Sequence, residues 1–302
     1  AIRELYAEFL DRKNLMEPIQ AYYKNYAVIF LDKWFKYIEE YQSNQTGKLQ
    51  EIIDTNPAKT AIVVGDGVSY EFAQDIIEKV SKEYTLSKEH QYIFAGLPSE
   101  TEHNMSQLYI DSGTVVKDKQ DREAYLLKQN KDKSIGFIDL EKVNETSDKE
   151  HYLICSYKDP DKLGETYQHK ALKYFDLVAG IFATKIEQLF KNGYQNVYLV
   201  TDHGFVLTGI LDNSDKIEVD FKGNVKISER FIRSENKQKI DTNLLIEKEV
   251  VYNNFNYSYF AKRLGPFKST GVYGFSHGGL SPQETIIPFL KWSNDNNTQD
   301  QV

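Results

Sequence analysis

The sequence predicts an α/β protein with a mainly parallel sheet and helices on both faces. Short apolar runs of strand length recur along the chain, and helical stretches separate them. Several of these runs end abruptly in glycine or aspartate. Strands that alternate with helices at this spacing indicate βαβ units, which build parallel sheets. The 302 residues, 40% of them hydrophobic, suffice for one large domain of this class or two smaller ones.

Composition and charge narrow the class of protein. The net charge is −8 and the sequence pI is about 5.4, which argues against binding of nucleic acid or anionic membranes through bulk charge. The single cysteine, Cys155, cannot form an intrachain disulfide, which fits a reducing cytoplasm. No apolar stretch approaches membrane-spanning length, and no signal peptide is visible. We therefore expect a cytoplasmic protein without a membrane partner.

Residues 1–56 are predicted to form an N-terminal helical segment. Two helices are expected within 1–43, then a polar loop at 42–47 and a short helix at 48–54. The chain begins inside helical sequence without methionine, which suggests a fragment of a longer protein with a domain upstream. An aromatic-rich stripe at helical spacing indicates core packing or a docking face rather than a ligand pocket. The stripe consists of Ile19, Tyr22, Tyr23, Tyr26, Ile29, Phe30, Trp34, Ile38 and Tyr41.

Residues 57–293 are predicted to form the main domain. The expected strands are one that ends in Gly65-Asp66-Gly67, followed by Tyr92–Ala95, Ser134–Leu140, His151–Tyr157, Val197–Val200 and Thr285–Lys291. The expected helices are Tyr70–Tyr84, about His103–Ile110, and a long helix Gly164–Lys191 after a loop at Lys158–Leu163. Residues 115–133 are charged and are expected to form a surface helix or loop.

A largely β insert or cap is expected at about 206–270, because short alternating runs there break the strand–helix pattern. These runs are Ile217–Phe221, Val225–Ile232 and Val250–Tyr259. The core is expected to resume at Gly271–Phe275. Residues 294–302 are rich in Asn, Asp and Gln and are predicted to be a disordered tail.

Side chains that can bind metal follow several predicted strands. Asp66 follows the first strand, and Asp202 and His203 follow the strand Val197–Val200, where Gly204 permits a sharp exit. The loop after His151–Tyr157 and a glycine-flanked segment supply further candidates: Asp159, Asp161, Glu165, His169 and His277. In open α/β sheets, ligands bind beyond the carboxyl ends of the strands. Carboxylates gathered there repel one another unless a cation neutralises them, and mixed carboxylate and imidazole ligands suit zinc, manganese or a related ion.

Thr101 lies at the same predicted edge, after a strand and at the start of a helix. Its hydroxyl could act as a nucleophile whose pKa a metal lowers, and the helix N-terminus would favour an incoming anion. The alternative is that Thr101, or Ser99, caps the helix. His103 and Asn104 could likewise contact a phosphoryl group or be ordinary residues of the first helical turn.

These motifs, in this order, resemble the alkaline-phosphatase superfamily and most closely its PglZ branch. The resemblance covers roughly residues 59–291 and ends in a His-Gly-Gly-Leu-Ser-Pro phrase. Its pieces are Gly65-Asp66-Gly67, Leu97-Pro98-Ser99-Glu100-Thr101, Asp161-Lys162-Leu163-Gly164-Glu165, Thr201-Asp202-His203-Gly204-Phe205 and Ser276–Glu284. It implies an alkaline-phosphatase-like fold with two divalent metal ions.

By this resemblance one metal is bound by Asp66, Thr101, Asp202 and His203. The other is bound by Asp161, Glu165 and His277. The superfamily often has histidine where Glu165 stands, so His169, one helical turn further on, is an alternative to Glu165. Asp159 is an alternative to Asp161. We expect zinc, with manganese or magnesium as alternatives that a glutamate at position 165 would favour.

The resemblance also implies a function. We expect a metal-dependent phosphohydrolase, most simply a phosphodiesterase for nucleotides or oligonucleotides, in which Thr101 forms a covalent intermediate that is then hydrolysed. The insert at 206–270 would shape the leaving-group pocket. Domains of this branch belong to larger proteins of bacterial phage-exclusion (BREX) systems and some response regulators, so we expect partner subunits of such a defence or signalling system, and a homodimer is possible. A non-catalytic interaction module with a metal site and a phosphomutase-like phosphotransferase are the alternatives.

Overall fold

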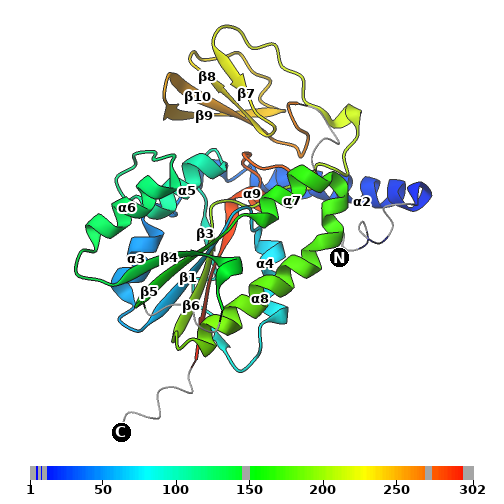
Figure 1. Ribbon diagram of the computed structural model, residues 1–302. Coiled ribbons are helices and arrows are strands. Elements are labelled where there is room, and N and C mark those ends of the chain that lie inside the picture. Colours follow the sequence, from blue (N-terminus) through cyan, green and yellow to red (C-terminus); the bar gives the residue numbers. More distant parts are fainter. Residues whose placement is uncertain (1–4, 6–7, 9–11, 145–149, 269–273, 295–302) are drawn as a thin grey trace.

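The structure is a computed structural model that describes residues 5, 8, 12–144, 150–268 and 274–294 (Figure 1). The predicted tail therefore lies outside the described residues except for Asn294, as does most of the segment Gly271–Phe275. For some residues inside helices only the backbone is described, and these are Lys13, Asp159, Glu165, Gln168 and His169.

A seven-stranded, mainly parallel sheet forms the centre of the molecule, in the order β2-β11-β6-β1-β5-β4, with β3 also paired to β11. The parallel strands are β1 (Thr60–Gly65), β4 (Ile135–Asp139), β5 (Tyr152–Tyr157) and β6 (Asn196–Thr201). The last strand, β11 (Ile286–Ser293), is antiparallel to β6, β2 (Thr85–Leu86) and β3 (Tyr92–Phe94). In the register, Gly65 lies opposite both Tyr157 and Thr201, so three carboxyl ends coincide at one edge.

Helices cover both faces of this sheet, as predicted, because β1 alternates its side chains between two cores. Ala61 and Val63 pack with α4 (Tyr70–Lys79) and α8 (Phe175–Lys191), while Ile62 and Val64 pack with helices on the opposite face. The opposite face is covered by α3 (Lys48–Thr55), α5 (Thr101–Tyr109) and α6 (Lys119–Gln129). Every residue of β1 is buried, which explains its uninterrupted apolar sequence.

Three helical predictions were wrong at their boundaries. The predicted loop at Lys158–Leu163 is helical from Asp159 onward, because α7 (Asp159–Tyr167) begins one residue after β5 ends. The predicted helix Gly164–Lys191 is divided into α7, the 3₁₀ segment η3 (Gln168–Tyr174) and α8. Ala171 and Leu172 are buried at the division, so tertiary packing overrides the helical pattern there. The helix predicted to reach Tyr84 ends at Lys79, after which the backbone of buried Val80 is extended.

The shorter 3₁₀ segments are η1 (Ile38–Glu40), η2 (Leu140–Lys142) and η4 (Asn213–Asp215).

The insert forms a four-stranded antiparallel sheet above the carboxyl ends of the main strands (Figure 1). Its order is β7-β8-β10-β9, with β7 (Val225–Ile227), β8 (Phe231–Ser234), β9 (Leu245–Tyr252) and β10 (Phe255–Ala261). A core of its own includes Ile232, Leu245 and Tyr259. The predicted run Ile217–Phe221 is not a strand, although its apolar side chains pack on this core. After the insert, α9 (Pro282–Thr285) leads into β11.

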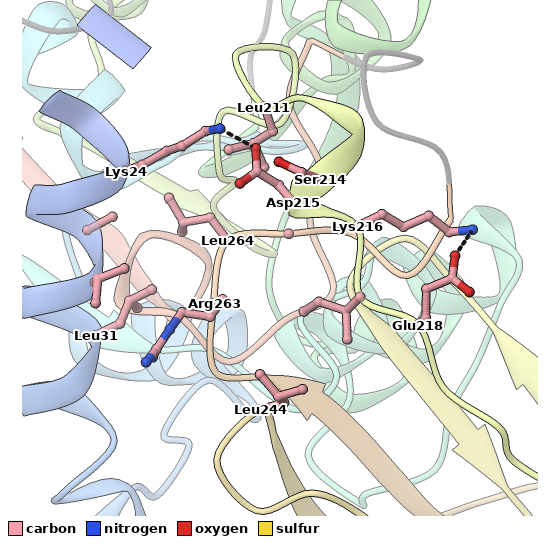
Figure 2. Close-up of a pocket in the computed structure, with 14 residues that line it drawn as sticks. Lys24, Leu31, Leu211, Ser214, Asp215, Lys216, Glu218, Leu244, Arg263 and Leu264 are labelled. Carbon is pink, nitrogen blue, oxygen red and sulfur yellow. Dashed lines mark ion pairs between the residues drawn. The ribbon is translucent and has the colours of Figure 1, made fainter. Parts of the chain in front are cut away.

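The N-terminal helix α2 (Lys13–Trp34) only partly buries its aromatic stripe. Leu31 is buried, and Tyr23 packs on the core, whereas Tyr22 and Tyr26 are 63% and 60% exposed. A cavity of about 460 Å³ separates α2 from the insert, and the ion pair between Lys24 and Asp215 spans its rim (Figure 2). Among the described helices, none combines the length and the apolar character needed to cross a membrane.

Candidate metal centre

Two strand ends lie side by side, and hydrogen bonds join the side chains of one to the backbone of the other. The amide of Gly67, after β1, donates to Oδ1 of Asp202, after β6, at 3.0 Å. The hydroxyl of Thr201 donates to the carbonyl of Gly65 at 3.0 Å and accepts from the amide of Val68 at 3.1 Å. Gly204 leaves this site at a point where a Cβ atom would lie 2.1 Å from the carbonyl oxygen of Gln283, so glycine is required there.

These strand ends bring together a first cluster, consisting of Asp66, Asp202 and His203. Asp66 is 8% exposed, and the other two side chains are completely buried. One ligand atom from each lies within 4.8 Å of the others. Nε2 of His203 is 3.3 Å from Oδ2 of Asp202 and 3.8 Å from Oδ1 of Asp66.

Thr101 completes this cluster. Its Oγ1 lies 2.9 Å from Nε2 of His203 and 3.3 Å from Oδ1 of Asp66. Thr101 is the first residue of α5, and the capping position belongs to Glu100, whose side chain makes no capping bond. Ser99 does not cap the helix either, because its hydroxyl donates to the carbonyl of Gly279. The hydroxyl of Thr101 is thus directed to the cluster instead of to its own helix.

The first cluster has the donor set and the unpaired atoms of a cation site. Oδ1 of Asp202 accepts two backbone amides, but its buried Oδ2 has no hydrogen-bond partner among the described residues. Nδ1 of His203 lies 3.0 Å from the carbonyl of Gly204, which can only accept, so this nitrogen carries the proton. Nε2 therefore presents its lone pair to Oδ2. Two acceptors facing each other in a buried site fit a bound metal ion.

The pKa values of the side chains in the first cluster also indicate a cation site. Burial raises the pKa of Asp66 well above its ordinary value, and the charges of Asp202 and Asp161 raise it further. Burial also raises the pKa of Asp202 from 3.8 to about 6. Burial, and then the neighbouring His277, lower the pKa of His203 well below its usual range. Without a cation, the clustered groups therefore disfavour their own charged forms.

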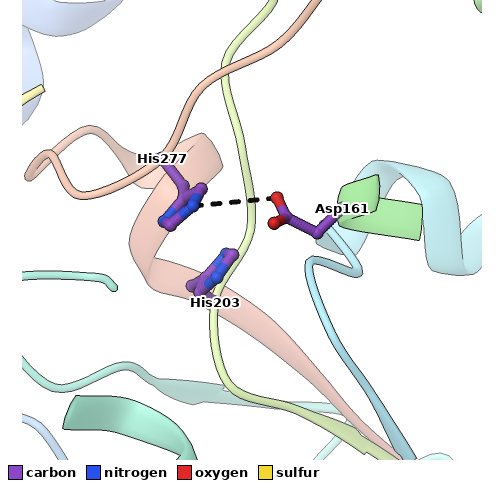
Figure 3. A group of neighbouring side chains, drawn as sticks. All are labelled: Asp161, His203 and His277. Carbon is purple, nitrogen blue, oxygen red and sulfur yellow. Dashed lines mark ion pairs between the residues drawn. The ribbon is translucent and has the colours of Figure 1, made fainter. Parts of the chain in front are cut away.

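A second cluster adjoins the first and shares His203 with it. Figure 3 shows its members, Asp161 from α7, His203 and His277. Nε2 of His277 is 3.7 Å from Oδ1 of Asp161, and the two imidazole rings stack with centroids 3.8 Å apart. Nδ1 of His277 donates to the carbonyl of Ser99 at 3.0 Å, which again leaves Nε2 for a ligand. Burial lowers the pKa of His277, but the charge of Asp161 and the Ser99 carbonyl outweigh this and raise it.

The other candidates for the second cluster belong to the same helical region as Asp161. Asp159 and Glu165 lie in α7, and His169 lies in η3. Their side chains lie outside the described part of the structure. The choices between Glu165 and His169, and between Asp161 and Asp159, therefore stay predictions.

Sequence reasoning missed one buried residue that shapes the site. Gln45 is fully buried, and its Nε2 donates to the carbonyls of Thr201 (3.1 Å) and Asp202 (2.7 Å). Its Oε1 accepts the amide of Gly96 at 2.9 Å, which ties β6 to the segment leading to Thr101. An amide in a polar, glycine-ended stretch is typical of a surface loop, so the sequence carried no signal for this role.

His103 and Asn104, in the first turn of α5, have structural partners. Nδ2 of Asn104 donates to the carbonyls of Gly96 and Asp202, both at 3.1 Å. Nε2 of His103 pairs with the Gln107 amide at 2.8 Å, and burial lowers the pKa of His103 to about 4. Both side chains therefore support the site from within the protein.

A cavity of about 210 Å³ opens beside the second cluster. Asp161, His277 and Glu100 line it from the main domain. The insert contributes the opposite wall, which includes Ser228, Glu229, Phe231 and Lys268. The centre is thus accessible to a small ligand at the junction between the sheet and the insert.

This chain is similar to a known protein in sequence and to solved structures in fold. Alkaline phosphatase-like protein PglZ of Bacillus cereus is 22% identical over an alignment of 261 residues, and the match covers 78% of this chain and 30% of that protein. The chain therefore spans less than a third of that relative. Murine ectonucleotide pyrophosphatase/phosphodiesterase 5 has been solved as an inactive variant with AMP and on its own. These two structures have TM-scores of 0.49 and 0.48, each at 12% identity, and the matches cover 78% and 77% of this chain and 87% of theirs.

Residues 46–173 and 161–292 match the model of one protein family, whose description is the BREX system PglZ alkaline phosphatase-like domain. These two matches together span most of the chain, including both clusters and Thr101. The chain belongs to the PglZ family of alkaline phosphatase-like domains.

Proposed function

We propose that this domain is a metal-dependent phosphohydrolase, most specifically a phosphodiesterase that uses Thr101 as its nucleophile. The observation that carries the proposal is the position of the Thr101 hydroxyl, 2.9 Å from His203 and 3.3 Å from Asp66 at the N-terminus of α5. A hydroxyl that lies against an imidazole and a carboxylate can lose its proton as it attacks phosphorus. The backbone amides at the start of a helix favour an anionic group in the same place.

The residues that would bind two divalent ions are those implied by the family. One ion would be held by Asp66, Thr101, Asp202 and His203, and the other by Asp161, Glu165 and His277. When bound, such ions neutralise the carboxylates, lower the pKa of the threonine hydroxyl and stabilise charge that develops on the phosphoryl oxygens. Zinc suits the first set, and a second set with glutamate in place of the superfamily's histidine would also accept manganese or magnesium.

The proposed reaction has two displacements at phosphorus. In the first, a bond forms between Oγ1 of Thr101 and phosphorus while the bond to the leaving oxygen breaks, and the leaving oxygen takes up a proton. In the second, water attacks phosphorus in the phosphodiester that links Thr101 to the retained part of the substrate; the bond to Oγ1 breaks, a phosphomonoester is released and the Thr101 hydroxyl regains its proton. Asp66 and His203 hold Oγ1 in place in both displacements.

We propose a nucleotide or oligonucleotide phosphodiester as the substrate. The 210 Å³ cavity beside the second cluster supports this choice, because a leaving group could lie between the centre and the insert. Ser228, Glu229 and Lys268 offer hydrogen-bonding groups on that wall. We also propose that the domain acts in a larger PglZ protein with partner subunits of a defence or signalling system.

The nucleophile is tested with bis-p-nitrophenyl phosphate after metal removal and addition of zinc, manganese or magnesium. Thr101→Ala should reduce kcat at least about a thousandfold, because it removes the attacking atom. Thr101→Ser should keep part of the rate, and acid-quenched wild-type protein should carry a p-nitrophenyl phosphate group on Thr101. Thr242→Ala, at an exposed threonine of the insert, is the matched control. A Thr101→Ala variant with the wild-type rate would exclude the mechanism.

The metal ligands are tested by the number of zinc ions bound. Glu165→Gln should remove the second ion, because it removes one of its ligands, and His169→Gln should leave that ion bound. The reverse result would assign His169 as the ligand. Two bound ions without turnover of any diester would indicate an interaction module. Transfer of phosphate to an added alcohol, without its release to water, would indicate a phosphomutase-like transferase.

A further inference from the structure

One short strand of the insert, together with the residue before it, contacts the segments that carry Thr101 and His277. Arg230, directly before β8, is 0% exposed, and Arg233, within β8, is 1% exposed. Each guanidinium is paired with a carboxylate in a segment of the main domain that carries a site residue. Neither arginine lines the 210 Å³ cavity, so both act on the site through other residues.

Arg233 holds the segment that carries Thr101. Its Nη2 is paired with Oε1 of Glu100, the residue immediately before Thr101 and the capping residue of α5. The guanidinium lies 4.0 Å from the centroid of the Tyr252 ring and 4.9 Å from that of Phe231, which fixes its orientation by cation–π contact. The Tyr252 hydroxyl also donates to the carboxylate of Glu102. The insert thus contacts the first turn of α5 through β8 and β9.

Arg230 holds the segment that carries His277. It makes a bidentate pair with Glu284, with Nε to Oε1 at 3.1 Å and Nη2 to Oε2 at 3.2 Å. The same carboxylate accepts the amides of Gly279 (2.8 Å) and Ser281 (3.2 Å) and the Ser281 hydroxyl (2.6 Å). Glu284 therefore closes the turn that follows His277, and Arg230 neutralises its buried charge.

The two segments also contact each other beneath β8. The Ser99 hydroxyl donates to the carbonyl of Gly279 at 2.8 Å and accepts the amide of Gly278 at 3.1 Å. A Cβ atom on Gly278 would lie 2.6 Å from the ring of Phe231, so the insert packs directly on this glycine. Together with the bond from Nδ1 of His277 to the carbonyl of Ser99, three hydrogen bonds therefore fix the distance between the Thr101 and His277 segments.

We propose that β8 is a positioning strand: Arg233 places Thr101 through Glu100, and Arg230 places His277 through Glu284. Both arginines are positioning residues, and the insert is a structural part of the metal centre as well as a wall of its cavity. The consequence for catalysis rests on the function proposed above, whereas the arrangement of the two segments does not.

The test compares local backbone protection in the metal-free protein by hydrogen–deuterium exchange. Arg233→Lys and Arg233→Met should speed exchange in peptides that span 97–104 more than in those that span 276–284. Arg230→Lys, and the double variant Arg230→Met with Glu284→Met, should do the reverse. The double variant removes both charges together, so no buried charge is left unpaired if a single variant fails to fold. Arg263→Met is the matched control, because this insert arginine pairs with Asp32 of α2 at 2.8 Å.

Two further measurements separate positioning from general stability. Arg233→Lys should lower kcat about 10-fold and leave the affinity for the second ion unchanged, as expected for a group behind Thr101. The Arg230 and Glu284 double variant should weaken the second zinc ion about 10- to 100-fold in calorimetric titration, with the first unchanged.

Exchange that rises uniformly along the chain, or that stays unchanged in both segments, would overturn the proposal. If the wild-type protein binds no metal or hydrolyses no ester, the proposed function fails. The exchange pattern of the metal-free variants still decides the role of β8 in that case.

Discussion

The two clusters of the metal centre differ in how firmly the fold holds them. In the first, Asp202 and His203 are completely buried and follow β6 directly, where backbone amides and Gln45 fix them. In the second, the side chains of Asp161 and His277 are 17% and 26% exposed and come from a helix and from the turn after the insert. Strand ends thus supply a preformed site, whereas the second site depends on how α7 and the insert are placed.

The largest difference is expected between the two histidines. His203 is a ligand of the first ion in the proposed set and touches Thr101, so His203→Gln should abolish binding of the first ion and lower kcat at least about a thousandfold. His277→Gln should remove only the second ion and cost about a hundredfold, since the nucleophile and its ligands remain. Zinc content per chain and kcat for bis-p-nitrophenyl phosphate measure both effects. Equal losses in the two variants would mean that the clusters bind metal as one unit.

The sequence predicted the first cluster better than the second for a physical reason. Asp66, Asp202 and His203 each follow an apolar run that is buried on both faces, and such runs are recognised without knowledge of their partners. The ligands expected beside Asp161 fall in a region that was predicted as a loop and a single helix, and its helical breaks are set by packing of residues such as Leu172. Gln45 could not be found at all, because its partners are backbone atoms that lie far away in the sequence.

In the insert, too, features that depend on local sequence could be predicted, whereas features that depend on contacts with distant residues could not. Alternating runs predicted a β-rich segment, and four antiparallel strands confirm it. The predicted run Val225–Ile232 is divided into β7 and β8, with Arg230 between them. No local pattern marks an arginine as buried, since its burial depends on Glu284 in another part of the chain.

A charge-removing change in the first cluster should stabilise the metal-free protein. Burial raises the pKa of Asp202 from 3.8 to about 6. For a raised pKa, the favourable contribution exists below pH 3.8 and is lost as pH rises through 6, so the ionised group destabilises the fold at pH 7.5. Asp202→Asn should therefore increase the free energy of unfolding by on the order of 3 kcal/mol at pH 7.5, and by nothing below about pH 4.

Denaturant titrations at the two pH values measure this gain, with zinc removed by a chelator. Asp161→Asn is the control in the second cluster, and it should gain less because its carboxylate remains in contact with solvent. With zinc present, Asp202→Asn should instead be less stable than the wild type, because it loses a ligand. A loss of stability in the chelated protein at pH 7.5 would show that Asp202 is not a cost to the metal-free fold.

Removing the amide that fixes β6 should affect the first cluster alone. Gln45→Leu leaves the carbonyls of Thr201 and Asp202 and the amide of Gly96 without their buried partner. We expect a loss of about 2 kcal/mol in the free energy of unfolding. Zinc affinity should fall at the first site and stay unchanged at the second, as calorimetric titration can resolve. Gln50→Leu is the control. Gln50 is a partly buried glutamine of α3, and its side chain bonds Asp54 and Asn130, which are not residues of the metal centre.

The smallest effect is expected where the insert meets α2. Lys24 pairs with Asp212 at 2.7 Å and Asp215 at 2.6 Å, but these side chains are 27%, 59% and 23% exposed, so solvent and salt screen the attraction. Lys24→Met should change the free energy of unfolding by less than about 1 kcal/mol, and by less still at high salt. Zinc affinity of the second cluster should be unchanged, because the buried pairs of Arg230 and Arg233 already place the insert. A loss of the second ion in Lys24→Met, as large as that caused by the Arg230 and Glu284 double variant, would show that α2 shares control of His277.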